Sequence, residues 1–205
     1  MKDINFLINH LKTSLKNFKI NIYEDKNIIY LLIEKYNLKE IIKFLKKDEN
    51  CLFLQLVDLT AVDNIDLENR FELIYILLSH KKNIRIILKV SLKEDEKINS
   101  ICDIFSSANW YERESYDLFG IIFEDHPDLR RIMTDYDFSG HPLRKDFPLT
   151  GHTQVRYDDL QKKVVYEPVK LQQEYRNFDY SSPWKGDEIN IDVNRDLKIK
   201  ENETA

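Results

Sequence analysis

The sequence predicts an α+β domain, with helices packed on one face of a mainly antiparallel or mixed sheet, followed by a long extended C-terminal tail. Three observations lead to this fold class. Apolar residues recur at helical spacing in some segments, β-rich runs alternate with those segments, and every glycine and proline lies beyond residue 119. Because glycine and proline interrupt regular structure, we expect helices and strands in residues 1–119, and turns and extended chain afterwards.

The N-terminal part predicts a helix, two strands and a second helix. Apolar residues three or four apart predict an amphipathic helix over residues 4–18. Residues 20–23 and 27–33 are typical of strands, and they meet at the polar turn 24–26. The spacing of apolar residues over 38–45 predicts the second helix.

The next segment predicts three more strands and a third helix. Residues 52–57, 71–79 and 84–92 form β-rich apolar runs. The four residues 80–83 separate the last two runs, which is a hairpin-length connection. Apolar residues three or four apart then predict a helix over residues 98–108.

Composition and charge exclude several classes of protein. The 205 residues carry a net charge of −5, divided into +2 over residues 1–100 and −7 over the rest, so no long basic surface is available for nucleic acid. No uninterrupted apolar run is longer than that of residues 28–33, which is far shorter than the roughly 20 residues of a membrane span. The polar N-terminus resembles neither a signal nor a transit peptide.

Two cysteines, Cys51 and Cys102, exclude a disulfide-rich scaffold and a cluster of four thiolates held by this chain alone. Both lie beside or within apolar patterns, so we interpret them as core thiols.

Apolar side chains continue beyond residue 146, where no sustained helical or strand period is visible. They include Phe147, Tyr157, Val164, Val165, Tyr166, Tyr175, Phe178, Tyr180 and Trp184. A disordered tail is one interpretation, but these side chains favour burial against the domain and a partner surface. We therefore expect an α/β domain over residues 1–119, a turn and tail anchor over 120–150, and an extended segment packing on partner subunits over 151–205.

The densest polar cluster is residues 110–120. On a helix, Arg113 and Asp117 lie four residues apart and Glu114 and Asp117 three apart, so they can share a face. Two carboxylates could act as a general acid and base. The helical spacing favours instead an ion-pair network around Arg113 that docks the helix on the domain or on another protein.

Three histidines, His126, His141 and His152, have aspartates nearby and could ligate a metal. Their separations of 15 and 11 residues match no standard short ligand pair, and two of them precede proline, which is common in turns. We expect no metal site.

Two basic pairs, residues 130–131 and 144–145, could hold phosphate. Acids lie beside them, at Asp128 and Asp146, and no glycine-rich phosphate loop accompanies them, so salt bridges are favoured. The sequence contains no nucleophile-elbow motif and no dinucleotide fingerprint. From the residues alone, no catalytic site follows.

A series of short motifs runs through residues 110–184. In chain order it comprises Glu112-Arg-Glu114, Asp117-Leu-Phe119, His126, Arg130-Arg-Ile-Met133, Gly140-His-Pro-Leu-Arg-Lys-Asp-Phe-Pro-Leu149, Arg156-Tyr-Asp-Asp159, Val165-Tyr-Glu-Pro168 and Ser182-Pro-Trp184. This series resembles the signature of the respiratory complex I 30 kDa subunit family, in its alphaproteobacterial and mitochondrial branch. The N-terminal part agrees with that family in size and element order.

The resemblance implies a subunit of the proton-translocating NADH-quinone oxidoreductase, with no catalytic, cofactor or metal site in this chain. In that complex, electrons pass from NADH through FMN and iron–sulfur clusters to quinone. The implied place is the peripheral arm, on the cytoplasmic side of the bacterial inner membrane. There the domain would pack beside the quinone-proximal D subunit, the tail would cross other peripheral-arm subunits, and the membrane would be reached only through the complex.

The resemblance also implies structural roles for individual residues. A docking network would comprise Glu112, Arg113, Glu114 and Asp117. The following turn would be fixed by His126, Pro127, Arg130 and Arg131. The start of the tail would be anchored on its partner by His141, Pro142, Arg144, Lys145, Asp146, Phe147 and Pro148.

Two positions depart from the family pattern: Asp137, where close relatives often have glycine, and residues 152–154, where an aromatic residue and an acid are usual. Two alternatives to complex I stay open. One is the equivalent subunit of a membrane-bound nickel–iron hydrogenase, against which the resemblance over 140–184 counts. The other is a metal-dependent hydrolase that uses His126, His141 and the surrounding aspartates.

Overall fold

The computed structural model describes residues 2–171 and 173. The chain divides into two compact units, residues 1–167 and 168–205, and the candidate site lies in the first. The predicted tail beyond residue 173, with its motif Ser182–Trp184, lies outside the described residues. None of the helices in the described part of the chain combines the length and the apolar character that a membrane span requires.

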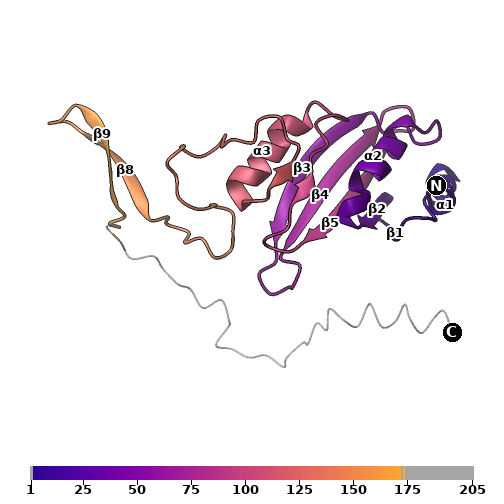
Figure 1. The fold of residues 1–205 in the computed structure, drawn as a ribbon, viewed down its shortest axis with the longest axis horizontal. Coiled ribbons are helices and arrows are strands. Elements are labelled where there is room, and N and C mark those ends of the chain that lie inside the picture. Colours follow the sequence, from indigo (N-terminus) through magenta and orange to yellow (C-terminus); the bar gives the residue numbers. More distant parts are fainter. Residues whose placement is uncertain (1, 172, 174–205) are drawn as a thin grey trace, which may run out of the picture. The chain divides into compact units, whose positions relative to one another are not determined.

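Helices are interspersed among runs of strands along the described chain (Figure 1). The helices are α1 (Lys2–Ser14), the short 3-10 helix η1 (Lys35–Asn37), α2 (Leu38–Lys47) and α3 (Ala108–Phe119). The strands are β1 (Ile20–Asp25), β2 (Ile28–Ile33), β3 (Gln55–Asp63), β4 (Phe71–Ser79), β5 (Ile84–Leu92), β6 (Ile98–Asn99), β7 (Phe123–Glu124), β8 (Thr153–Asp158) and β9 (Lys163–Pro168).

The five longer N-terminal strands form one mixed sheet in the order β1-β2-β5-β4-β3. The β2–β5 pair is parallel, and the other neighbouring pairs are antiparallel. β4 and β5 pair in register from Phe71 opposite Leu92 to Ser79 opposite Ile84, which confirms the predicted hairpin.

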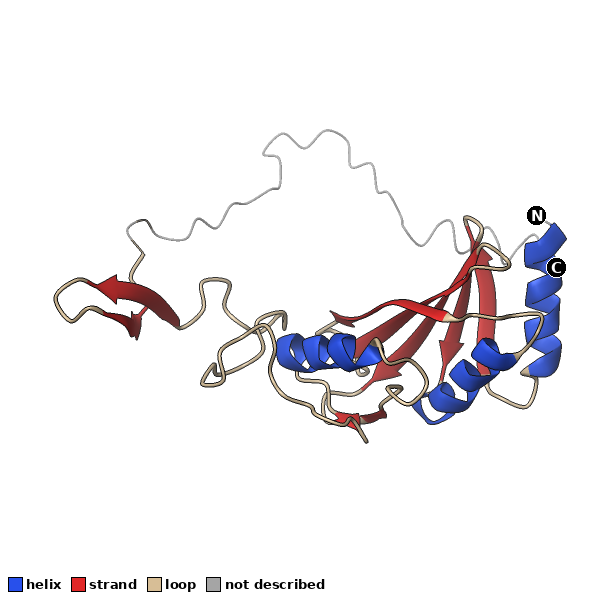
Figure 2. Cartoon of the chain, turned by 90° about the horizontal axis from the view of Figure 1, so that it is seen from above, coloured by secondary structure: helices blue, strands red, loops and turns tan. Residues whose placement is uncertain are grey.

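One face of this sheet forms the core. Every second residue is buried in β4 and in β5, because successive side chains of a strand point to opposite faces. Figure 2 shows α2 and α3 along the same side of the sheet. The apolar face of α2 contributes four fully buried residues, Leu38, Ile41, Ile42 and Leu45. The predicted α+β class is confirmed.

The predicted strand over 52–57 is shifted in the structure, where β3 starts at Gln55 and continues to Asp63. The reason lies at the end of α2. The N–H of Leu52 donates to the carbonyl of Asp48 at 2.9 Å, and that of Phe53 to the carbonyl of Leu45 at 3.0 Å. These N–H groups are therefore used by α2, and pairing with β4 starts at Gln55.

The predicted helix over 98–108 is wrong. Ile98 and Asn99 form β6, which pairs in parallel with β7, and this pairing requires extended backbone. The next N–H, of Ser100, donates to the carbonyl of Glu124 at 2.8 Å. The turns that follow place the side chains of Ile101 and Phe105 in the core, where both are buried. Their spacing thus reflects burial in the core, although the segment is not a helix.

Residues 151–168 are more regular than predicted, because β8 and β9 form a two-stranded sheet. All side chains of both strands are exposed or half-buried. The apolar alternation is short, Val155 with Tyr157 in β8 and Val164 with Tyr166 in β9. Such a short period is a weak strand signal.

Candidate functional site

Helix α3 carries the predicted polar cluster. The hydroxyl of Tyr111 donates to the carbonyl of Val57 at 3.0 Å and ties the helix to β3. The helix ends at Gly120, whose φ of 81° is left-handed. The carboxylates of Glu112 and Asp117 are fully buried. A buried carboxylate needs partners inside the protein, and both residues find them in loops outside α3.

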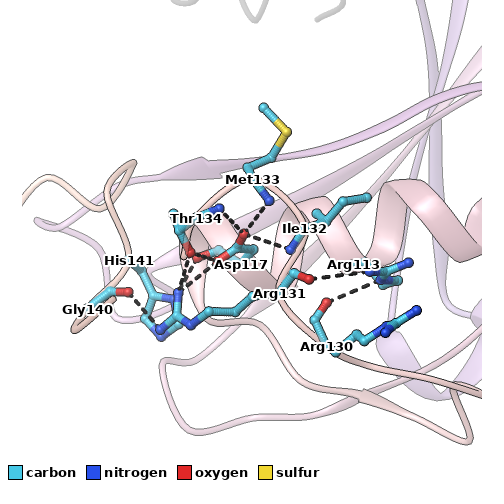
Figure 3. Close-up of polar contacts among 9 residues, drawn as sticks. All are labelled: Arg113, Asp117, Arg130, Arg131, Ile132, Met133, Thr134, Gly140 and His141. Atoms are coloured by element: carbon cyan, nitrogen blue, oxygen red, sulfur yellow. Dashed lines mark hydrogen bonds and ion pairs between the residues drawn. The ribbon is translucent and has the colours of Figure 1, made fainter. Parts of the chain in front are cut away.

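The carboxylate of Asp117 binds a turn that follows in the sequence (Figure 3). Its Oδ2 accepts the backbone N–H groups of Ile132, Met133 and Thr134 at 3.0, 2.7 and 2.9 Å. Its Oδ1 accepts the Thr134 hydroxyl at 2.6 Å and Nη1 of Arg131 at 2.7 Å. These contacts hold residues 131–134, here called the Asp117 turn, on α3.

The protonation of Asp117 follows from these contacts. Burial opposes ionisation, but the hydroxyl of Thr134 and the backbone N–H groups outweigh it and hold the pKa of Asp117 well below its usual range. The carboxylate is therefore ionised at neutral pH, and its oxygens already accept several hydrogen bonds. Asp117 acts as a structural anion, because a general acid or base needs a lone pair or proton available to a substrate.

Two arginines complete the Asp117 turn. Arg113 donates from Nε to the carbonyl of Arg130 at 3.2 Å and from Nη2 to that of Arg131 at 3.3 Å. Its guanidinium lies 5.2 Å from the ring centroid of Trp110. Arg131 donates from Nη2 to the carbonyl of Gly140 at 3.1 Å, which links the turn to the next segment (Figure 3).

The ion-pair network predicted around Arg113 is centred on Asp117 in the structure. Asp117 pairs with Arg131, which lies 14 residues further along the chain. Arg113 is buried and binds backbone carbonyls, and Glu114 is exposed. The sequence correctly placed these side chains on one helix, but the partners described for Arg113 and Asp117 come from the loop after it.

The chain returns to the end of α3 at His141 and Arg144. Nδ1 of His141 donates to the carbonyl of Asp117 at 2.9 Å, and Nε of Arg144 donates to that of Phe119 at 2.6 Å. A Cβ at Gly120 would lie 2.6 Å from the Arg144 guanidinium and 2.7 Å from the His141 ring. Glycine is thus required at position 120 for two reasons, the left-handed backbone and the close approach of Arg144 and His141. Burial lowers the pKa of His141.

A second cluster, which the sequence reasoning missed, holds the same segment on the sheet. Arg70 forms a two-pronged pair with Asp63, at 2.8 and 2.9 Å. The same guanidinium reaches Asp146 at 2.9 Å and Glu94 at 3.1 Å, and Arg144 reaches Glu94 at 2.9 Å. The hydrogen bonds from Arg70 lower the pKa of Asp63. These five residues form the Arg70 cluster.

Further contacts strengthen the Arg70 cluster. The backbone N–H of Lys145 donates to Asp63 at 2.8 Å, and the Phe71 ring lies 5.2 Å from the guanidinium groups of both Arg70 and Arg144. One signal was available in the sequence, because Asp63 and Arg70 flank the connection between two neighbouring strands. Nothing in the sequence indicated the contact with residues 144–146.

Glu112 holds the loop before α3. Its Oε1 accepts the N–H of Ile101 at 2.8 Å, and its Oε2 lies 3.4 Å from the thiol of Cys102 and 4.0 Å from Nε2 of His126. Burial raises the pKa of Glu112 and raises that of Cys102 to about 11. Cys102 is therefore a protonated thiol at neutral pH.

His126 uses both ring nitrogens within the chain. Nδ1 accepts the N–H of Asp128 at 3.0 Å, so Nε2 carries the proton and donates to the carbonyl of Asn109 at 3.1 Å. Pro127 is exposed, and Arg130 pairs with Asp128 at 2.9 Å on the surface. The predicted turn role of His126 fits this geometry, and a metal would have to displace one of these bonds.

Two groups of three ligand-type side chains occur within the described residues. They are His10, Asp48 and Cys51, and Cys102, Glu112 and His126. Neither group joins His126 to His141, so the hydrolase alternative finds no assembled site in this part of the chain.

The remaining predicted residues lie at the surface or in a small aromatic group. Pro142 is half-buried and Pro148 is exposed. The ring of Phe147 lies 5.7 Å from that of Phe138 and 5.5 Å from that of His152. The predicted anchor residues thus contact the chain's own domain, and their contact with a partner stays a prediction.

Comparisons of the sequence with a family model and with individual proteins point to the same family. The family described as the respiratory-chain NADH dehydrogenase 30 kDa subunit matches residues 31–153. The chain is 49% identical over 183 residues to the C subunit of NADH-quinone oxidoreductase from Mesorhizobium japonicum, covering 87% of this chain and 91% of that protein. It is 50% identical over 183 residues to the C subunit from Xanthobacter autotrophicus, covering 89% of this chain and 88% of that protein. It is 57% identical over 150 residues to the C subunit from Ruegeria pomeroyi, covering 73% of this chain and 75% of that protein.

A solved structure shares the fold. It is a chain of the membrane-bound sulfane sulfur reductase, an archaeal respiratory membrane complex, with a TM-score of 0.61 and 21% identity. The similarity covers 71% of this chain and 85% of that one, and at this identity it concerns the fold alone. Because the family match covers more than half of the sequence and the C-subunit relatives span most of it, the chain belongs to the respiratory-chain NADH dehydrogenase 30 kDa subunit family, that of the C subunit of NADH-quinone oxidoreductase.

Proposed function

We propose that this chain is a docking subunit of the peripheral arm of complex I, with no redox centre of its own. Its domain packs beside the quinone-proximal D subunit, and the segment after α3 supplies a large part of the contact. Other subunits hold the FMN and iron–sulfur clusters that carry electrons from NADH to quinone. The chain reaches the cytoplasmic face of the inner membrane through the complex.

The observation that carries this proposal is the exposed apolar surface after α3. The exposed large hydrophobic residues between α3 and residue 167 are Ile122, Met133, Tyr136, Leu143, Leu149, Val155, Tyr157, Leu160, Val164 and Tyr166. Burial of apolar surface is the main favourable contribution to association. The Asp117 turn and the Arg70 cluster hold part of this segment in one conformation, which lowers the entropic cost of binding.

The two thiols support a role without a metal cluster. Cys51 is fully buried, and burial raises the pKa of its thiol far above the usual range. Cys102 lies beside the carboxylate of Glu112, and burial raises its pKa as well. Iron–sulfur clusters are held by thiolates, usually four of them, so neither side chain is arranged for that task.

The proposal is tested by affinity purification of the N-terminally tagged full chain from gently solubilised membranes, followed by mass spectrometry. We expect recovery with the D subunit, the iron–sulfur subunits and NADH dehydrogenase activity. Recovery with nickel–iron hydrogenase subunits would move the chain to the alternative complex. Recovery as a lone monomer would overturn the proposal.

A further inference from the structure

A cavity of about 330 Å³ lies between the loop that follows the Asp117 turn and the β8–β9 sheet. Phe138 and Phe147 come from the loop, His152 lies just before β8, and Tyr166 comes from β9. Asp135 and Asp137 supply two carboxylates to the same lining. The cavity therefore combines aromatic walls with negative charge, which is the composition that receives an organic cation.

The aromatic walls are held by their own contacts. The Phe138 and Phe147 rings lie 5.7 Å apart at 32°, and the His152 ring meets Phe147 edge-on at 5.5 Å and 77°. A Cβ at Gly140 would lie 2.9 Å from the Phe147 ring, so glycine at this position lets the ring keep its place. The walls are thus set by the fold before any ligand arrives.

The acids are placed at one side of the aromatic group. The hydroxyl of Tyr166 donates to Asp135 at 3.1 Å, and this bond and the charge of the same carboxylate raise the pKa of Tyr166. Within residues 2–171 and 173, no basic side chain forms an ion pair with Asp135 or Asp137. Arg131 lies 5.9 Å from the Phe138 ring, but its charge is already paired with Asp117.

We propose that this cavity binds an arginine side chain of a neighbouring subunit. The inference rests on the proposed function, because it assumes a partner at this surface. A planar guanidinium stacks on aromatic faces and offers five donors, which suits two carboxylates beside a group of rings. An ammonium group is more strongly hydrated and loses more on leaving water. The same chain already places Arg113 over Trp110 and Arg131 over Phe138.

The first test is the stability of the purified complex. Asp137→Asn keeps the shape of the side chain and removes its charge, and Asp66→Asn removes an equal charge from an exposed position outside the cavity. We expect Asp137→Asn to speed loss of the tagged subunit from the complex by about ten-fold at low salt. The difference should shrink as salt screens the pair. Asp66→Asn should behave as the wild-type chain does.

The second test identifies the occupant. A photo-crosslinking residue, p-benzoylphenylalanine, replaces the exposed Tyr136, which lies between the lining residues Asp135 and Asp137; it is activated in the assembled complex, and the linked peptides are sequenced. An arginine of another subunit within the linked stretch supports the proposal. A lysine, a stretch with no basic residue, links within this chain alone, or an unchanged loss rate for Asp137→Asn would each overturn it. A wild-type chain that enters no complex would instead overturn the proposed function.

Discussion

The carboxylate of Asp117 accepts the backbone N–H of Thr134 at 2.9 Å and its hydroxyl at 2.6 Å, across 17 residues of sequence. This double contact makes one helix residue determine the course of the chain after α3. Arg131 adds a charged contact to the same carboxylate and continues to the carbonyl of Gly140. The proposed docking segment is therefore coupled to the folded core through this buried carboxylate, in addition to the contacts of Arg113 and of the Arg70 cluster.

Asp117→Asn tests this coupling. The amide keeps the size of the side chain but loses the charge and replaces one acceptor oxygen by a donor, which leaves N–H groups of residues 132–134 poorly matched. We expect the free energy of unfolding in urea to fall by about 3–5 kcal/mol, the range for breaking a buried charged pair. The control is Glu114→Gln, an exposed acid on the same helix, which should change it by less than about 0.5 kcal/mol. Equal effects of the two substitutions would contradict the role of Asp117.

The same contact predicts a pH dependence of stability. The pKa of Asp117 is lower in the folded than in the unfolded chain, so its contribution is fully present above the unfolded value of about 3.9. The contribution is lost as the pH falls from there through the folded pKa. Urea titrations between about pH 5 and pH 2 should show a smaller loss of stability for Asp117→Asn than for the wild-type chain. Parallel curves for the two proteins would refute this assignment.

Glu112 should act in the opposite direction, because burial raises its folded pKa. Its ionisation disfavours the folded chain as the pH rises above the unfolded value of about 4.3. Glu112→Gln keeps an acceptor for the N–H of Ile101 and removes this titration. In urea titrations, we expect the stability of this variant to fall less than that of the wild-type chain as the pH rises from about 4 to 7. An identical pH profile would show that Glu112 does not titrate in this range.

Gly120→Ala tests the close approach at the end of α3. The left-handed backbone alone costs a non-glycine residue about 1–2 kcal/mol, and the new Cβ would also displace Arg144 and His141. Gly151→Ala is a matched control, because its φ of 68° is also left-handed but the nearest heavy atom, the Thr153 carbonyl oxygen, is 3.9 Å from the Cβ position. We expect Gly120→Ala to lower the free energy of unfolding in urea more than Gly151→Ala does. Similar losses would mean that the packing of Arg144 against α3 is unimportant for stability.

Local patterns predicted the elements that face the core and missed those held by distant partners. The alternation over 71–79 and 84–92 gave β4 and β5 with their observed bounds, because burial of one sheet face leaves a two-residue period. Ile98 and Ile101 fit a helical period, but pairing with β7 overrode it. That pairing depends on residues more than 20 positions away, so the local sequence around Ile98 does not indicate it.

In the candidate site, too, local spacing predicted which residues share an element but not their distant partners. Spacing placed Arg113 and Asp117 on one helix face and predicted an ion-pair network around Arg113. The structure pairs Asp117 with Arg131 instead, because the chain after Gly120 turns back along α3. The Arg70–Asp146 contact joins the residue before β4 to the tail anchor, and no local sequence pattern indicates a contact between residues so far apart in the chain.

A chain that ends after Thr150 is expected to keep its folded core and to lose its association with the D subunit. The buried hydrophobic core of the described residues ends at Phe123, so the truncation removes none of it. It removes the exposed side chains of β8 and β9, including Val155, Tyr157, Val164 and Tyr166, and the Tyr166–Asp135 bond. The unfolding midpoint in urea should therefore change little, while affinity purification of the truncated chain should recover no partner. A chain that ends after Leu171 is the control, because it keeps both strands and separates their contribution from that of later residues. Normal recovery of the D subunit by the chain ending at Thr150 would show that docking depends on the domain and the segment before residue 151 alone.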